Sequence, residues 1–422
     1  MKKRFFELIK KCKTYKDLYD VPWKYFYGKK VDKNFHVNIL LLNSVCNGFG
    51  DVVFCIKLGN YLKEWYNANV VIATPLPDGF KTVGGFAEEN IYTLKGGKTG
   101  QCRRFKFLSL YDFSGKNKID LPKFDLIFLA PLQADYDINL SDVKSIIPYS
   151  NKFNTFTFSE YNDSLDKKHD FNTGVGQGRC GIFLTNEKVK DKLSIVGKDK
   201  FAFLYVGKVG NEEKCILSFV EMILKKYKYK TFQIVLPKWV WEEILSDEKL
   251  KVFLKMVEKY RGGSVYVNDV LFKEVNKKKS SLIIRPNILP IPRNDILKLM
   301  KYSVRDILLT GDQSITDCLS CCPNKTIWYQ TVPWKINFAK NISKELPQKY
   351  LGRISTSCGQ IQNIRFKSKS YSLFKQNWDF RKLAKKKLDG IIKSVGGDKE
   401  MEDFKETVHN IKSLKNIKKK YK

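Results

Sequence analysis

Residues 36–51 read HVNILLLNSVCNGFGD, and this run indicates a class of fold more strongly than any other part of the chain. It begins with a nearly continuous apolar segment at 36–43, the pattern of a strand buried on both faces of a parallel sheet. A loop at 44–50 follows, and apolar residues then recur at helical spacing after Asp51. A second apolar strand at 69–74 completes a βαβ unit, so the sequence predicts an α/β domain with a largely parallel sheet.

The same pattern restarts at residues 201–207, FAFLYVG, where another buried strand leads into a glycine turn. The first series is expected to contain further strands at 124–132 and 181–185. In the second series, strands are expected at 231–237, 264–267, 281–289, 306–310 and 326–330. Two complete series of strands and helices favour two Rossmann-like, doubly wound domains that face a central cleft.

The length of the chain agrees with this division. At 422 residues, the chain exceeds the size at which a single hydrophobic core usually stops growing. We therefore expect a basic N-terminal helical extension at 1–32, a first Rossmann-like domain at 33–195, a second at 196–345, and a basic helical C-terminal extension at 346–422.

The chain is strongly basic, with 77 lysine and arginine residues against 44 acidic residues and a formal net charge of +33. Such a charge attracts acidic partners: nucleic acid, an anionic membrane surface or phosphorylated small molecules. Much of the excess lies at the two ends of the chain, where solvated helical faces are the simpler explanation for the lysine runs. Charge alone does not choose among these alternatives.

Three features of the sequence bear on where the protein works. The N-terminus does not resemble a secretory signal, because Glu7, Lys10 and Lys11 interrupt its apolar residues. No stretch approaches the ~20 apolar residues that a membrane span requires. The ten cysteines are scattered, several of them inside apolar runs, as in a protein of a reducing compartment. We expect a cytoplasmic protein, with peripheral membrane association as a further option.

The loop between the first strand and the first helix is a candidate site. Gly48 and Gly50 allow a tight turn there. Asp51 either caps the helix or, at the carboxyl end of a strand, takes a proton from an attacking nucleophile. The loop lacks the third glycine of a dinucleotide-binding GxGxxG motif, and an acid at the helix start opposes pyrophosphate binding. A nicotinamide cofactor is therefore disfavoured.

A second candidate is the turn Gly311-Asp312-Gln313-Ser314, which follows the strand expected at 306–310. Its backbone N–H groups and the Ser314 hydroxyl can bind phosphate oxygens at the start of a helix. The Asp312 carboxylate can accept two hydrogen bonds from the vicinal hydroxyls of a ribose. An ordinary N-capped helix is the alternative explanation of the same residues.

The second series, from the helix NDILKLMKY at 294–302 through GDQS to the strand TIWYQ at 326–330, resembles the donor-binding half of GT-B glycosyltransferases. In that family, the corresponding glycine-rich turn holds the diphosphate and ribose of a nucleotide sugar. The loop NGFGD resembles that of the bacterial protein-arginine rhamnosyltransferases, which are inverting GT-B enzymes. This resemblance implies that Asp51 is the general base, with Asn47 at the family's other acidic position and Gln313 in place of an acid.

GT-B enzymes stabilise the departing diphosphate with a helix N-terminus and basic side chains, so the resemblance implies no bound metal. Lys208 and Arg285, each near the end of an expected strand, are candidates for that contact. Glu160 and the glycines Gly174 and Gly176 are candidates for holding the acceptor or the sugar. The two glycines belong to DFNTGVGQGR, which we expect to form a flexible loop over the cleft or a passive linker.

Two features could indicate a metal instead. Asp135-Tyr136-Asp137 follows a buried strand, the context of the metal-binding DxD motif of GT-A glycosyltransferases. That fold has one nucleotide-binding half and would not give a second series of strands. We interpret Cys318, Cys321 and Cys322 as small buried residues on a helix, because no nearby histidine completes a zinc site.

The preferred hypothesis is a metal-independent glycosyltransferase that moves a sugar from a nucleotide-sugar donor to a protein, glycan or lipid-linked acceptor. One alternative is a nucleic-acid-binding protein whose basic ends contact phosphates while the α/β body serves as scaffold. Another is a membrane-surface enzyme in which Phe5, Phe6, Leu8 and Ile9 of the N-terminal helix contact anionic lipid.

Overall fold

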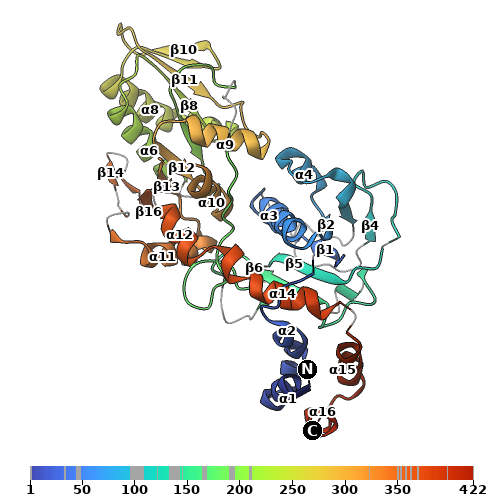
Figure 1. Cartoon of the computed structure of the whole chain (residues 1–422). Coiled ribbons are helices and arrows are strands. Elements are labelled where there is room, and N and C mark those ends of the chain that lie inside the picture. Colours follow the sequence, from blue (N-terminus) through green and yellow to red (C-terminus); the bar gives the residue numbers. More distant parts are fainter. Residues whose placement is uncertain are drawn as a thin grey trace.

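The computed structural model of the chain is an α/β protein with two mixed sheets (Figure 1). It describes residues 2–32, 35–43, 49–95, 109–120, 122–132, 143–144, 146–163, 169–189, 195–208, 212–322, 324–348, 351, 354–356, 359–361, 364–367, 370–396 and 398–421. Across these residues, none of the helices combines the length and the apolar character needed to cross a membrane.

The first sheet has six strands in the order β4-β3-β2-β1-β5-β6. All of its neighbouring strands are parallel except β3 and β4. Its central strand β1 is buried over nearly its whole length, which explains the continuous apolar run in the sequence. The strands are β1 (Asn38–Leu42), β2 (Asn69–Thr74), β3 (Ile91–Lys95), β4 (Ser109–Tyr111), β5 (Leu126–Leu132) and β6 (Thr155–Ser159).

The second sheet has eight strands in the order β10-β9-β11-β8-β7-β12-β13-β16. Its inner strands are parallel, and the edge strands β10 and β16 run antiparallel to their neighbours. The strands are β7 (Phe201–Tyr205), β8 (Thr231–Val235), β9 (Ser264–Val267), β10 (Val270–Glu274), β11 (Ser281–Arg285), β12 (Asp306–Leu309), β13 (Thr326–Tyr329) and β16 (Ile364–Lys367). A separate pair is formed by β14 (Ile354–Thr356) and β15 (Gly359–Ile361).

The two sheets are built outward from an inner strand in a similar way. In each, the first strand of the series, β1 or β7, lies inside the sheet. The next strands extend the sheet to one side (β2 and β3, or β8 and β11), and later strands extend it to the other (β5 and β6, or β12 and β13). This is the doubly wound order of Rossmann-like sheets. The predicted α/β class is confirmed.

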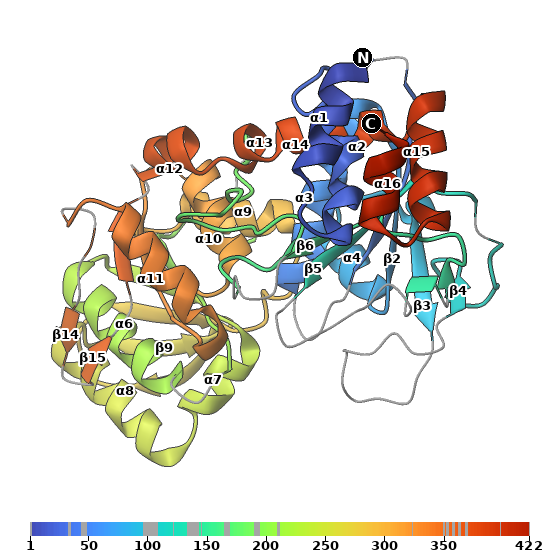
Figure 2. The ribbon, with the colours of Figure 1, turned by 90° about the horizontal axis from the view of Figure 1, so that it is seen from below.

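Helices cover the sheets and form both ends of the chain (Figures 1 and 2). Helix α3 (Phe49–Tyr66) follows β1, and helix α10 (Asp312–Cys321) follows β12. The other α-helices are α1 (Lys2–Lys11), α2 (Val21–Phe26), α4 (Pro77–Val83), α6 (Glu212–Lys226), α7 (Lys238–Ile244), α8 (Asp247–Tyr260), α9 (Arg293–Tyr302), α11 (Ile336–Glu345), α12 (Tyr371–Asn377), α13 (Phe380–Leu383), α14 (Lys385–Ser394), α15 (Lys399–Asn410) and α16 (Leu414–Lys420). Short 3₁₀ segments are η1 (Tyr15–Asp20), η2 (Glu88–Asn90) and η3 (Pro333–Lys335).

One apolar cluster runs from the first sheet to the second. Val53 of α3, Tyr161 after β6 and Ile315 of α10 all belong to it. Two further clusters involve one sheet each. Because α3 and α10 share the central cluster, the two helices connect the halves of the chain. The predicted burial of Cys318, Cys321 and Cys322 is confirmed.

The two ends of the chain pack against each other, as the views in Figures 1 and 2 show. Helices α1, α2, α15 and α16 enclose a cluster that includes Phe5, Ile9, Phe404 and Ile417. Phe5 is 8% exposed and Ile9 is 1% exposed. Phe5 and Ile9 are thus part of a core inside the protein, whereas Phe6 and Leu8 of the same helix are partly exposed.

Helix α14 returns the chain to the first half. The Tyr66 hydroxyl at the end of α3 donates a hydrogen bond to Asp389 at 2.8 Å. Gly390 packs so closely on α2 that an added Cβ would lie 2.4 Å from the carbonyl oxygen of Trp23. Only glycine allows this approach of the two helices without a shift of the backbone.

Two predicted features of the fold are wrong. Residues 181–185 are buried, but within them Gly181 and Ile182 form isolated bridges and no strand of the sheet. Their partners, Gly174 and Asp379, lie outside the sheet as well. The segment 346–422 is not solely a helical extension, because β16 continues the second sheet beyond residue 345.

Candidate functional site

The turn before α10 has the geometry of a helix N-terminus that a small anion can approach. Gly311 occupies the N-cap position with φ of 75°, a backbone conformation that favours glycine. An added Cβ there would meet no atom within 4 Å. The first N–H groups of an α-helix have no acceptor inside the helix, and they carry the positive end of the helix dipole. Gly311 and Ser314 are both partly exposed.

Asp312 and Gln313, the two middle residues of this turn, face the interior of the protein. The Asp312 carboxylate forms an ion pair with Lys335 at 2.9 Å, and it is buried. The Gln313 side-chain oxygen accepts a hydrogen bond from Lys57 of α3 at 3.1 Å. This differs from the expectation that both side chains contact a ligand, because both are already engaged by lysines.

Lys335 links the two halves of the chain through carboxylates. Its ammonium contacts Glu160, which follows β6, as well as Asp312. All three side chains are buried. Burial alone would lower the pKa of Lys335, but Asp312 and Glu160 outweigh it, and the pKa is raised. Glu160 therefore binds a lysine of its own chain, where the sequence suggested an acceptor or a sugar.

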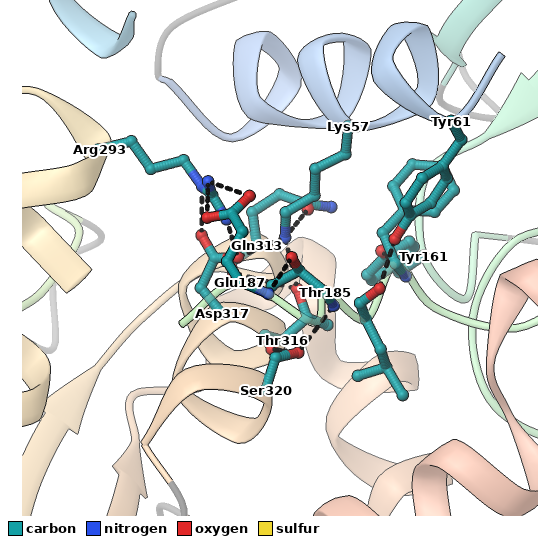
Figure 3. Close-up of polar contacts among 12 residues, drawn as sticks. Lys57, Tyr61, Tyr161, Thr185, Glu187, Arg293, Gln313, Thr316, Asp317 and Ser320 are labelled. Atoms are coloured by element: carbon teal, nitrogen blue, oxygen red, sulfur yellow. Dashed lines mark hydrogen bonds and ion pairs between the residues drawn. The ribbon is translucent and has the colours of Figure 1, made fainter. Parts of the chain in front are cut away.

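A second buried ion cluster joins α3 and α10 (Figure 3). Lys57 lies 2.7 Å from Asp317, and Arg293 donates two hydrogen bonds to the same carboxylate at 2.8 and 2.9 Å. Arg293 also pairs with Glu187 at 2.8 Å. The cluster holds two cations and two anions, so it is neutral as a whole.

The pKa shifts in this cluster follow from burial and pairing. Burial lowers the pKa of Lys57, and Asp317 opposes that shift only in part. The pKa of Asp317 is lowered, because Lys57 and Arg293 outweigh the opposite effect of burial. The pKa of Arg293 is raised by Asp317 and Glu187 against burial. Pairing thus favours the charged forms of Asp317 and Arg293, whereas burial disfavours the charged form of Lys57.

The contacts of α3 and α10 join the middle of α3 to the first half of α10. Lys57 reaches Gln313, Thr316 and Asp317 in the first half of α10. Further along α3, the Tyr61 hydroxyl donates to the carbonyl of Leu184. Further along α10, Ser320 accepts a hydrogen bond from the neighbouring Thr185 at 3.1 Å. Figure 3 shows these side chains between the two helices.

Asp51 lies in the first turn of α3, about 9 Å along the helix axis from Lys57 at a rise of about 1.5 Å per residue. Asn43, at the end of β1, donates to the backbone carbonyl of Asp51 and to that of Ala130, both at 3.2 Å. These bonds fix the start of α3 to the carboxyl ends of β1 and β5. Asp51 is partly exposed.

The two basic residues expected at the diphosphate have other partners. Lys208 is 69% exposed and lies 3.4 Å from Glu243 of α7. Arg285 donates to Asp269 at 2.7 Å through one amino group, and to Gln233 at 2.7 Å through Nε. Lys208 is therefore loosely held, whereas Arg285 is fixed to the turn between β9 and β10.

The glycine segment at 170–179 packs inside the protein, which corrects the expectation of a flexible loop. Gly174 and Gly176 have φ of 121° and 112°. A Cβ on Gly174 would lie 2.6 Å from the backbone nitrogen of Asn162. Asn162 also accepts a hydrogen bond from Val175 N–H at 2.9 Å. The glycines thus allow a tight contact within the chain.

Several predicted residues lie outside the described part of the chain. They are Asn47, Gly48, Asp135 and Asp137. Over the described ranges, no group of three or more His, Cys, Asp or Glu side chains is arranged to hold a metal ion. A cavity of about 580 Å³ lies among α1, α15 and α16 and contains none of the predicted site residues.

Sequence reasoning missed three residues of this region: Lys57, Gln330 and Lys335. Gln330 follows β13 and forms two hydrogen bonds with Gly207, at 2.7 and 3.0 Å, which tie together the carboxyl ends of β7 and β13. A polar residue directly after a buried strand was the available signal for Gln330. A lysine inside the apolar helix at 49–66 was the signal for Lys57.

Comparison with protein-family models gives no match for this chain, and comparison with curated proteins gives none either.

Proposed function

We propose that the protein is a metal-independent glycosyltransferase with a GT-B-like arrangement, in which a nucleotide-sugar donor and an acceptor meet at the first turns of α3 and α10. The observation that carries the proposal is the packing of the first half of α10 on α3, where Lys57 contacts Gln313 and Asp317. Asp51 precedes Lys57 by six residues on α3, and the Gly311 turn contains Gln313. In doubly wound sheets, ligands bind beyond the carboxyl ends of the strands, where such turns lie.

In this proposal the donor diphosphate binds at the start of α10. The backbone N–H groups and the Ser314 hydroxyl donate hydrogen bonds, and Gly311 leaves room for close approach. A carboxylate in the first turn would normally repel a diphosphate. Lys335 offsets part of that repulsion, because it pairs with Asp312 at 2.9 Å while also pairing with Glu160. The role of Asp312 is then to position Lys335 rather than to bind ribose.

Asp51 acts on the acceptor. Its carboxylate takes the proton from the attacking acceptor group while a new bond forms to the anomeric carbon of the sugar. The bond between that carbon and the diphosphate oxygen breaks, and the nucleoside diphosphate leaves with the electron pair. Attack from the side opposite the leaving group inverts the configuration. Lys208 is exposed and loosely paired, so it is free to turn toward the diphosphate, unlike Arg285.

A thermal-shift panel of UDP-, GDP-, dTDP- and CMP-sugars, each with and without EDTA, tests the proposal. One nucleotide class should raise the melting temperature by a few degrees, since ligand at 100 times its Kd adds about 2.7 kcal/mol. EDTA should not change the shift. No shift with any nucleotide sugar, together with strongly salt-dependent binding of DNA or RNA, would favour a nucleic-acid-binding protein instead.

The variant Ser314→Glu locates the binding. A carboxylate in the first turn suits a helix dipole, so the fold should be retained, but it occupies the place of the diphosphate. The stabilisation by nucleotide sugar should disappear. Asn294→Glu is the matched control, because Asn294 is exposed in the first turn of α9 and receives the same charge. An equal shift in Ser314→Glu and in the control would contradict the placement of the donor.

A further inference from the structure

The outermost strand of the second sheet exposes a row of apolar side chains. Strand β10 (Val270–Glu274) lies at the edge, beyond β9 (Figure 1). Val270 is 71% exposed, Leu271 is 55% exposed and Phe272 is 38% exposed. Single exposed apolar residues are ordinary, but three consecutive ones on one projecting strand mark a surface that contacts something other than water.

Lysines accompany these apolar residues. Lys273 lies in the same strand, and Lys277, Lys278 and Lys279 follow directly after it in the chain. All four are exposed. Apolar side chains beside a group of lysines fit an anionic lipid surface, where the apolar groups enter the interface and the ammonium groups meet lipid phosphates.

The hairpin of β9 and β10 is held in a fixed shape. Its turn contains Asn268 and Asp269, with φ of 48° and 70°. Arg285 of β11 pairs with the Asp269 carboxylate, and the ring of Phe272 contacts Trp241 of α7 at 5.6 Å between centroids. A surface that is already ordered loses little conformational freedom when it binds. The ion pair between Arg285 and Asp269 thus holds the turn of this hairpin in place.

Pairing of β10 with a second copy of the chain fits these observations less well. The register of β10 against β9 shifts between Leu271 and Lys273, and such irregularities disrupt the regular ladder that strand pairing needs. Lys273, a charged residue inside this edge strand, also disfavours pairing with another strand, and the lysines of two copies would repel each other across such a pair. Nucleic acid would use the lysines but gives no reason for Val270 and Leu271 to be exposed.

We infer that the β9–β10 hairpin docks the protein on anionic membranes, with Val270 and Leu271 in the lipid headgroup region and Lys273 and Lys277–Lys279 near lipid phosphates. This surface differs from the N-terminal helix, whose Phe5 and Ile9 are buried in the cluster with α15 and α16. The inference does not rest on the proposed transferase activity. A protein without that activity would bind lipid through the same residues.

Co-sedimentation of the full chain with phosphatidylcholine vesicles, with and without phosphatidylglycerol, tests the inference. The chain should bind only the vesicles that contain phosphatidylglycerol. The double variant Val270→Ser/Leu271→Ser should bind at least about tenfold more weakly, because both side chains lose their apolar contact with lipid. Both are more than half exposed, so the variant should keep its fold. The variant Lys277→Gln/Lys278→Gln/Lys279→Gln should bind about 100-fold more weakly.

The matched control is Ile195→Ser/Leu383→Ser, which removes two apolar side chains that are 39% and 41% exposed elsewhere on the molecule. It should bind vesicles as the wild type does. Three results would overturn the inference: no binding by the wild type, equal binding by the Val270/Leu271 variant, or an equal loss in the control. Two further results would overturn the inference if neither variant changed vesicle binding. One is a dimer of the wild type that dissociates only in the Val270/Leu271 variant, and the other is RNA binding that is lost only in the lysine variant.

Discussion

Asp51 could have a structural role at the start of α3 or a catalytic role as general base, and the two roles make different predictions. Because α3 begins at Phe49, Asp51 stands inside the first turn and is not the cap that the sequence suggested; there its charge suits the helix dipole, and as a general base it must also keep that charge. Asp51→Asn separates the two, because loss of the dipole interaction costs only about 0.3–1 kcal/mol of stability, whereas an asparagine cannot take the proton at all.

We predict that Asp51→Asn lowers turnover of the donor at least about 100-fold, the usual contribution of a general base, and leaves donor binding unchanged. Turnover and thermal shift measured on the same preparation check this. Glu64→Gln is the control, since Glu64 is an exposed acid further along the same helix. Full activity in Asp51→Asn would remove Asp51 from the role of base.

Lys325 gives a prediction about pH that does not depend on function. Burial lowers its pKa from 10.5 to about 8. Between these values the unfolded chain binds more protons than the folded chain, so this lysine makes the free energy of unfolding rise with pH. Its ammonium donates to the carbonyl of Val304 at 3.0 Å, which explains why a lysine is tolerated there.

Lys325→Met should therefore flatten the stability curve. The difference in unfolding free energy between wild type and variant should change with pH between about 8 and 10.5, on the order of 3 kcal/mol in total. Denaturant unfolding at several pH values measures it, with the exposed Lys301→Met as control. A difference that stays constant over this range would show that the lysine titrates as it does in the unfolded chain.

Residue-level contacts were the hardest feature to predict from the sequence. Lys57 and Asp317 come from different halves of the chain, and no local pattern connects them. The turn at 311–314 was found because glycine before a helix has a recognisable signature, but the burial of Asp312 depends on Lys335, which follows another strand. Sequence pattern locates turns, whereas tertiary packing decides which of their side chains remain available.

At the scale of elements, the buried parallel strands were predictable and the edge strands were not. Strands β1, β7 and β12 are buried on both faces, because apolar clusters cover the sheet on both sides. Strand β10 is exposed along its whole length and β16 lies at the opposite edge, so neither carries that continuous signal. Residues 181–185 are apolar and buried without being a strand, which shows that burial alone does not define one.

The contact between α14 and α2 gives a prediction about elements. Gly390→Ala should lower the free energy of unfolding by about 1–3 kcal/mol, because the new methyl group would meet the Trp23 carbonyl oxygen. Gly50→Ala, in α3, has no atom within 4 Å of the new Cβ and should stabilise the protein by up to about 1 kcal/mol. Urea unfolding of both variants checks this. Equal effects would mean that α14 does not pack on α2 as described.

For the molecule as a whole, the charge of +33 is distributed over separate surfaces. Where the two halves meet, Lys57, Arg293 and Lys335 all pair with carboxylates, and none of the basic excess lies at these three residues. The terminal helices use their apolar sides to pack together, and the hairpin of β9 and β10 adds lysines at the edge of the second sheet. The net charge is therefore the sum of several surfaces with different surroundings, and its value does not by itself identify one binding partner.

Amide hydrogen exchange, measured with and without the nucleotide sugar that stabilises the chain most, tests the central claim most directly. A donor and an acceptor site shared by α3 and α10 predicts slower exchange in both 49–56 and 311–317 when the ligand is present, with no change in 264–274. Slower exchange at only one of the two helix starts, or at neither, would contradict the claim that they form one site.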